Sequence, residues 1–407
     1  MRRQTRWMVA VAVAGVSLLA TACASTSESA PESAVETAPE TAPESTTEGA
    51  SAEGRLAVAY ENGLAVLDGE TLEVVDRFET EEFTRLNPFG DGRTVVVTTS
   101  QGFQVLDTAE PALTDLVFDA TTPGHVVIHE GKTVLFDDGT GTTTILDTDA
   151  FDGGYDELPE SETYAADAAH HGVSIVLEDG TLVTTVGDET ARTGAVALHP
   201  HEDHWDEAAS SDQCPGIHGE GTAAGEAVIF GCEDGALLFQ DGAFTKLTAP
   251  DDYGRMGNAY VSETSPIVVG DYKNDPDAEG YLLNALTLID TDAVTYEVVD
   301  LPDDVQFTYR DVARGPEDLA YILATDGRIH VLDPETGELT DAFEVVAPWE
   351  GPVEWQDPHP AMKVSGDIAY VTEPATNTVH AVDLTTGETV ASAELDAAPN
   401  ELAVALG

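Results

Sequence analysis

The chain has 407 residues, of which 77 are acidic and 16 are basic, so its formal net charge is −61. A chain this acidic repels nucleic-acid phosphates and anionic lipid head groups, which leaves cations as its natural partners. Hydrophobic residues make up 42%, an ordinary share for a globular protein, and the length suits one large all-β domain or two smaller domains. Because acidic residues are spread along the whole chain, adaptation to high salt or to a high-GC genome explains most of the charge, and the charge alone identifies no cation site.

Residues 1–22 have the features of an export signal. Three arginines precede an apolar run from Met8 to Ala22, and Cys23 follows directly. This arrangement resembles a lipoprotein signal peptide in which Cys23 becomes the lipidated residue. A retained anchor helix is the alternative, although a run of about 15 residues is short for a membrane span. We therefore expect export and attachment to the outer face of the cell membrane.

Residues 23–54 are expected to form a lipidated cysteine followed by a disordered acidic tether. From residue 24 onward the segment contains no aromatic residue, lysine or arginine, and a glutamate recurs at every fourth position from Glu28 to Glu48. Like charges at this spacing and three prolines oppose a helix. Such a composition favours an extended linker, and collection of metal by the glutamates is the alternative.

Residues 55–407 repeat one phrase: an apolar strand, a turn, and a second apolar strand that ends in aspartate. Examples are Leu56–Tyr60 followed by Leu64–Asp68, and Thr94–Thr98 followed by Phe103–Asp107. Short strands that recur in a longer unit are typical of a β-propeller, and helical periodicity is almost absent. The sequence therefore predicts one all-β propeller domain over residues 55–407.

Eight units fit the repeat better than seven. Eight units require about 44 residues each, within the usual range of propeller repeats, whereas seven require about 50. The first unit lacks an inner strand, and Glu401–Leu406 is left over at the other end, so we expect the C-terminal strand to pair with the N-terminal blade and close the ring. The eight candidate inner strands lie near Arg85, His125, Tyr164, Ile217, Ala259, Phe307, Ala361 and Glu401.

Cys214 and Cys232 remain as an even pair once Cys23 is assigned to the lipid. A turn near Ala224 and Gly225 would place them nearly opposite each other on neighbouring strands. An exported chain reaches an oxidising compartment, so we expect a disulfide, with a thiolate metal site as the alternative.

Histidines recur on three successive predicted inner strands, which would bring them to one central channel. His125 and His129 lie on the third, His170 and His171 end the fourth, and His218 lies on the fifth. Imidazole is a preferred zinc ligand, and the alternative for each residue is a hydrogen-bonded channel histidine. Our first choice of zinc ligands is His125, His170 and His218, with His129 and His171 as alternatives and a carboxylate as a further possible ligand.

A second group of histidines and carboxylates occupies residues 199–207, which we expect to be a polar loop between the fourth and fifth blades. Its candidate ligands for metal capture are His199, His201, Asp203, His204 and Asp206. A mobile loop must be ordered on binding, so it should hold a cation weakly and exchange it quickly. A solvated acidic loop without a metal is the alternative.

The segment Cys214–Glu220 with Phe230–Gly235 resembles the periplasmic zinc chaperones of the AztD type, which accompany a zinc ABC transporter. Further agreement comes from Trp355-Gln-Asp-Pro and from the closing segment that begins at Ala398. The resemblance covers essentially all of residues 55–407. It implies a propeller that binds zinc and passes it to the solute-binding protein of the transporter. Two features depart from that family: the lipoprotein signal with its tether, and the position of the histidine-rich segment at residues 199–207.

The sequence therefore favours a surface-anchored zinc metallochaperone, without catalytic residues, that acts as a monomer and contacts the membrane only through its lipid. Two alternatives remain, a metal-dependent propeller hydrolase or lactonase and a scaffold for protein contacts. The ligand types do not distinguish zinc from copper or nickel, so zinc rests on the resemblance.

Overall fold

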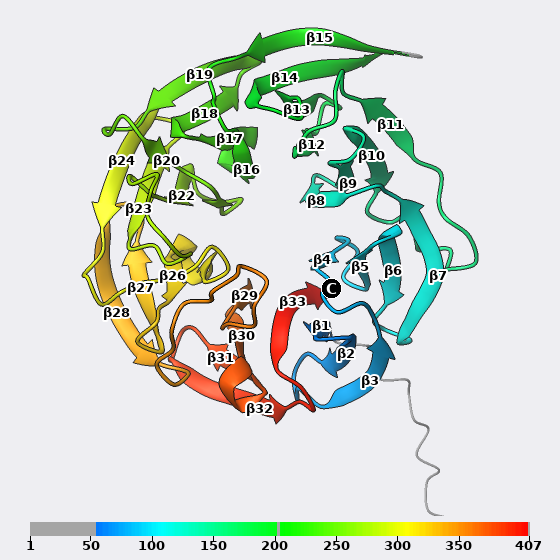
Figure 1. The fold of residues 1–407 in the computed structure, drawn as a ribbon, viewed down its shortest axis with the longest axis vertical. Coiled ribbons are helices and arrows are strands. Elements are labelled where there is room, and N and C mark those ends of the chain that lie inside the picture. Colours follow the sequence, from blue (N-terminus) through cyan, green and yellow to red (C-terminus); the bar gives the residue numbers. More distant parts are fainter. Residues whose placement is uncertain (1–53, 202–203, 406–407) are drawn as a thin grey trace, which may run out of the picture. The chain divides into compact units, whose positions relative to one another are not determined.

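The computed structural model describes residues 54–201 and 204–405. The predicted signal peptide, the lipidated Cys23 and nearly all of the predicted tether lie outside this range. The described residues form eight sheets, each with four antiparallel strands and one with a short fifth strand, around a central channel, which confirms the eight-bladed propeller (Figure 1). Among them, no helix is both long enough and apolar enough to cross a lipid bilayer.

The first four blades, each given from its inner to its outer strand, comprise the following elements. Blade one contains β33 (Pro399–Ala405), β1 (Arg55–Tyr60), β2 (Gly63–Asp68) and β3 (Val74–Glu79). Blade two contains β4 (Leu86–Pro88), β5 (Thr94–Thr99), β6 (Gly102–Asp107) and β7 (Ala112–Asp119). Blade three contains β8 (Pro123–His129), β9 (Lys132–Asp137), β10 (Thr142–Asp147) and β11 (Glu162–Ala165). Blade four contains β12 (Ser174–Val176), β13 (Leu182–Gly187), β14 (Arg192–His201) and β15 (His204–Ser211).

The other four blades follow the same order. Blade five contains β16 (His218–Ala223), β17 (Ala227–Cys232), β18 (Asp234–Gln240) and β19 (Ala243–Thr248), and β20 (Gly254–Arg255) pairs with β18 in parallel. Blade six contains β21 (Ala259–Tyr260), β22 (Ile267–Asp271), β23 (Ala285–Asp290) and β24 (Thr295–Asp300). Blade seven contains β25 (Val312–Arg314), β26 (Ala320–Leu323), β27 (Arg328–Asp333) and β28 (Glu338–Glu344). Blade eight contains β29 (Met362–Ser365), β30 (Ile368–Glu373), β31 (Thr378–Asp383) and β32 (Glu388–Glu394). Three 3-10 turns occur at Ala224–Glu226, Pro316–Asp318 and Pro374–Thr376.

Burial explains why the middle strands have continuous apolar sequences. A middle strand is covered on both faces by the neighbouring blades, so all its side chains are buried, as in β17. The outermost strands face solvent and are largely exposed, as in β3. The apolar cores therefore lie between successive blades.

The aspartate that ends the repeated phrase stabilises the turn after its strand in several blades. Asp68 Oδ1 accepts hydrogen bonds from the backbone N–H groups of Glu70 and Thr71 at 3.2 and 3.0 Å. Asp107 and Asp383 accept equivalent bonds from the residue two positions later, at 3.0 and 2.8 Å. This Asx-type turn directs the chain into the outermost strand, which accounts for the recurrence of aspartate in the sequence.

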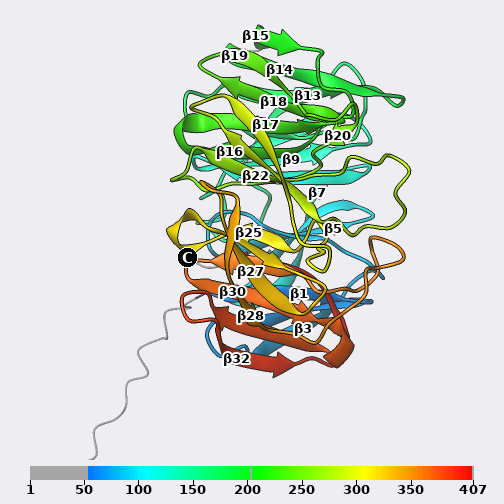
Figure 2. The same cartoon turned by 90° about the vertical axis from the view of Figure 1, so that its left-hand side faces the viewer.

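The ring closes as predicted. The C-terminal strand β33 pairs antiparallel with β1, with Leu56 opposite Val404, and forms the inner strand of blade one. The side view in Figure 2 shows β3 and β32, the outer strands of the first and last blades, next to each other at this closure. Pairing of the last strand with the first blade removes two open sheet edges.

Two of the predicted inner strands are wrong. Tyr164 belongs to β11, which folds back on β10 as the outer strand of blade three, because Tyr164 pairs with Thr143. The inner strand of blade four begins ten residues later, at Ser174. Phe307 forms an isolated bridge with Leu283, and the inner strand of blade seven is β25, from Val312.

The predicted disulfide is present. Cys214, just before β16, is bonded to Cys232 at the end of β17, with a Cα–Cα distance of 5.0 Å. Both residues are fully buried in the core between blades four and five. The bond ties the start of the inner strand of blade five to its neighbour.

Candidate metal centre

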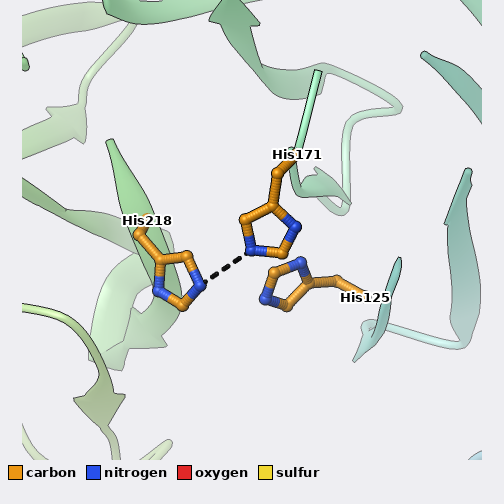
Figure 3. A group of neighbouring side chains, drawn as sticks. All are labelled: His125, His171 and His218. Carbon is orange, nitrogen blue, oxygen red and sulfur yellow. Dashed lines mark hydrogen bonds between the residues drawn. The ribbon is translucent and has the colours of Figure 1, made fainter. Parts of the chain in front are cut away.

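Three histidines from three successive blades meet at the channel wall. His125 lies on β8, His171 lies in the segment before β12, and His218 is the first residue of β16. Their ring centres are 5.0 to 5.2 Å apart, and one nitrogen of each ring lies within 4.8 Å of those of the other two. Figure 3 shows the three rings facing one another. This group could hold a metal ion.

A backbone carbonyl orients the ring of His125. Its Nδ1 lies 2.9 Å from the carbonyl oxygen of Gly172. A carbonyl oxygen only accepts hydrogen bonds, so Nδ1 carries the proton and the lone pair of the neutral ring is on Nε2.

A carboxylate orients the ring of His171. Its Nδ1 lies 2.5 Å from Oδ2 of Asp138, and the other oxygen of Asp138 accepts the backbone N–H of Gly172 at 3.2 Å. The carboxylate is thus held from two directions and in turn fixes the imidazole. A carboxylate in this position also makes a histidine a more basic metal ligand.

A β-bulge makes the third contact possible. Nδ1 of His218 donates to the carbonyl oxygen of Gly257 at 2.5 Å. The register of β16 against β17 shifts between His218 and Glu220, and Gly219 in the bulge has φ +62°. A Cβ at Gly219 would collide with the same Gly257 carbonyl, so only glycine allows this close approach.

The three Nδ1 contacts turn the Nε2 atoms of the rings toward one point. Nε2 of His171 and Nε2 of His218 are 3.0 Å apart, with both Nδ1 protons already used. Two lone pairs cannot bond to each other, so this contact requires a proton or a cation between or beside them. In a tetrahedral zinc site the ligand nitrogens lie about 3.3 Å apart, close to this separation. The arrangement suits a metal held by three imidazoles, with a fourth position open.

Burial keeps two of the rings neutral. Desolvation, with the neighbouring His218 and His171 rings and Arg85, lowers the pKa of His125 to about 3. Desolvation also lowers the pKa of His218 to about 3. Neutral imidazole is the form that binds a metal, so these two ligands are ready at neutral pH without losing a proton.

The other two candidate histidines of the channel strands lie outside this cluster. His170 is 4% exposed, and its ring contacts the carbonyl of Ala168 at 3.0 Å on one side and the hydroxyl of Thr185 at 3.0 Å on the other. His129 pairs with Glu226 at 3.1 Å. The structure thus places His171, an alternative in the sequence analysis, where His170 was expected.

The histidine-rich segment is not the predicted loop: its two sides, β14 and β15, pair as antiparallel strands of blade four. His201 and His204 are register partners on β14 and β15, and their ring centres are 4.8 Å apart. His204 pairs with Asp206 at 3.4 Å, and His199 contacts Thr181 at 3.1 Å. Asp203, the remaining candidate, lies outside the described residues.

Two cavities border the cluster. All three histidines line the central channel, a cavity of about 890 Å³. His171 also lines a second cavity of about 540 Å³, which contains Asp138, Asp188 and Glu189. The side chain of His171 is 44% exposed, so among the three ligands it is the one that both cavities reach.

The groups that orient the rings have almost no signature in the amino-acid sequence. Only Asp138 is marked in the sequence. It follows Asp137 directly, whereas the repeated phrase elsewhere ends in a single aspartate, as at Asp68 and Asp107. The carbonyl groups of Gly172 and Gly257 have no side-chain signature at all.

Comparison with known proteins gives the following results. No protein-family model matches the chain. A curated relative, the zinc chaperone AztD of Citrobacter koseri, is 23% identical over 312 residues, which cover 74% of this chain and 70% of AztD. Two solved structures of Citrobacter koseri AztD, one of them the apo form, have TM-scores of 0.70 and 0.69 at 20% identity and cover 86% of this chain and 97% of AztD.

The chain resembles the zinc chaperone AztD. The resemblance inferred from the cysteine-histidine segment is thus confirmed. Dihydro-heme d1 dehydrogenase NirN is also similar, with a TM-score of 0.59 at 13% identity, and this likeness shows only the shared fold. AztD is a chaperone rather than an enzyme, in agreement with the predicted non-catalytic role.

Proposed function

We propose that this protein is a zinc metallochaperone whose ligands are His125, His171 and His218. The observation that carries the proposal is the convergence of three imidazole Nε2 atoms whose Nδ1 protons are all bound elsewhere. Similarity to the zinc chaperone AztD supports zinc as the cargo. A site with three protein ligands leaves one position open, which suits an ion that must later be released.

We further propose that zinc passes to the solute-binding protein of a zinc ABC transporter by exchange of ligands. His171 is the most accessible of the three ligands and borders both cavities, so an incoming ligand can replace it first. The carboxylates of Asp138, Asp188 and Glu189 beside it favour approach of a cation. Stepwise exchange would keep the ion bound throughout.

The hairpin at residues 199–207 is proposed as a site of weaker capture. His201, His204 and Asp206 lie together on its exposed part. The proposed cellular position is the outer face of the cell membrane, through the lipid on Cys23, and the protein is proposed to act as a monomer.

Zinc titration of the full-length chain tests the ligand set. We expect H125Q, H171Q and H218Q each to lower zinc affinity by about 100-fold or more, because each removes one of three ligands. The matched controls are H170Q, which alters the neighbour of His171, and H380Q, on β31. Both should keep one tightly bound zinc per chain. Zinc retained in H171Q but lost in H170Q would disprove the assignment.

A transfer assay tests the chaperone function. The zinc-loaded chain is mixed with the solute-binding protein in the presence of a chromophoric chelator, and the metal content of each protein is measured after separation. Direct exchange predicts that the acceptor gains zinc while the chelator stays metal-free. Trapping of the zinc by the chelator before the acceptor gains it would show simple release.

A further inference from the structure

Basic side chains are concentrated in the central channel of this very acidic protein. The chain has 16 lysines and arginines against 77 acidic residues. Six of these basic side chains line the channel cavity of about 890 Å³, namely Arg85, Arg255, Lys273, Arg310, Arg314 and Lys363. The channel is therefore far more basic than the composition of the chain would suggest.

Three of the basic residues come from other blades than the metal ligands, whereas Arg255 on β20 belongs to blade five, as His218 does. The three histidines come from blades three, four and five. Arg85 precedes β4 in blade two, Arg310 precedes β25 in blade seven, and Lys363 lies on β29 in blade eight. In Figure 1, β4 and β29 lie on the opposite side of the channel from β12 and β16.

Most of the channel cations have partners of their own. Arg310 donates to Glu401 at 2.9 Å and to the backbone carbonyl of Asn400 at 3.1 Å. Arg314 donates to the backbone carbonyls of Ile267 and Asp318, both at 2.5 Å. These two guanidinium groups are accounted for by the fold.

Arg85 and Lys363 differ from them. Within the described residues, neither side chain has a hydrogen bond or an ion pair, and Nε of Arg85 is buried without a partner. Desolvation lowers the pKa of Lys363. The negative charge of Glu401 raises this pKa, and the positive charges of Arg85 and Arg310 lower it. Lys363 is exposed to the channel and Arg85 is half-buried, so both cations can reach an ion in the channel, and an anion between them would offset their mutual repulsion.

We propose that Arg85 and Lys363 form a binding site for a small oxyanion, a phosphate or a carboxylate, in the same channel as the metal centre, between blades two and eight. A guanidinium binds such groups through paired N–H donors, and an ammonium adds a point charge. The channel is large enough for such an ion. An anion here would also offset the charge of a metal on the three neutral imidazoles.

Isothermal titration of the metal-free, full-length chain with inorganic phosphate, acetate and chloride tests the site. We expect one phosphate per chain in wild type and weak binding of chloride at equal ionic strength. R85M and K363M should each weaken phosphate binding at least tenfold, and K363R should retain most of it. The matched controls are R77M and K132M, which remove exposed basic residues from β3 and β9. Comparison of phosphate with acetate shows which oxyanion class the site prefers.

Absence of phosphate binding in wild type, or equal binding in all variants, would overturn the proposal. Phosphate-dependent thermal stabilisation of wild type gives a second measurement that does not depend on the folding of any variant, and its absence also counts against the site. Zinc titration of K363M in chloride buffer separates this proposal from the proposed function. If K363M retains zinc but loses phosphate binding, the two sites are independent. If wild type itself binds no zinc, the proposed metal centre is wrong and the oxyanion site is unaffected.

Discussion

At the scale of single residues, the candidate metal centre depends on groups that hold the ligand rings. Each of the three imidazoles donates its Nδ1 proton to a fixed acceptor, which is a backbone carbonyl for His125 and His218 and the carboxylate of Asp138 for His171. The acceptors decide which nitrogen carries the lone pair and where it points. Asp138 is the only one of the three acceptors that a side-chain substitution can remove.

We expect D138N to lower zinc affinity by about 10- to 100-fold without changing the stoichiometry, because an amide leaves the ring of His171 less basic and less firmly oriented. Competition with a chelator measures the affinity. E189Q is the control, since Glu189 lines the same cavity and the substitution removes the same charge. An equal loss in both variants would show that only the local charge matters.

At the scale of elements, the disulfide supports the strand that begins with a ligand. Cys214 precedes His218 by four residues and is bonded to Cys232 on β17. The bulge at Gly219 and the contact with Gly257 lie in the same short stretch. Stability of blade five and geometry of the ligand are therefore linked.

The double variant C214S/C232S should lose about 3 kcal/mol of unfolding free energy, the value expected for a loop of this length in the chain-entropy model. It should also bind zinc more weakly, because the start of β16 is no longer tied to β17. Denaturant unfolding and zinc titration measure the two effects, with C23S as the thiol control. Unchanged zinc affinity in a destabilised variant would separate the disulfide from the metal centre.

At the scale of the whole molecule, the ring is held closed by β33 and by a buried polar network. Arg310 of blade seven donates a hydrogen bond to Glu401 on β33. It also lies within hydrogen-bond distance of the ring of His359, which is 3% exposed. The side chains of Arg310 and Glu401 are 6% and 8% exposed. Burial and the adjacent guanidinium lower the pKa of His359 to about 4, so this ring stays neutral in the network.

R310M should destabilise the protein by about 3 to 5 kcal/mol, because it leaves Glu401 buried without its partner. Urea unfolding measures this loss. R77M is the matched control: Arg77 pairs with Asp396 near the same closure, but the two side chains are 43% and 81% exposed, so the expected loss is below about 1 kcal/mol. Similar losses in both variants would mean that Arg310 has no special part in closing the ring.

The repeated phrase was enough to predict the blades, their number and the closure, since each middle strand is buried on both faces and must be apolar whatever its neighbours are. The error at Tyr164 arose where the phrase is interrupted. The segment between β10 and β11 is long, and its next strand returns to its own blade instead of starting a new one. Strand order depends on pairing with distant residues, which local sequence does not specify.

The sequence by itself determined an all-β propeller of eight blades, a disulfide between Cys214 and Cys232, and histidines on three successive blades. Only the tertiary structure decided which histidines meet. Neighbouring residues of an extended chain point to opposite sides, so His171 faces the channel while His170 turns into its own blade. The contacts that fix which ring faces the channel come from residues distant in the sequence, Asp138 just after β9 for His171 and Thr185 on β13 for His170.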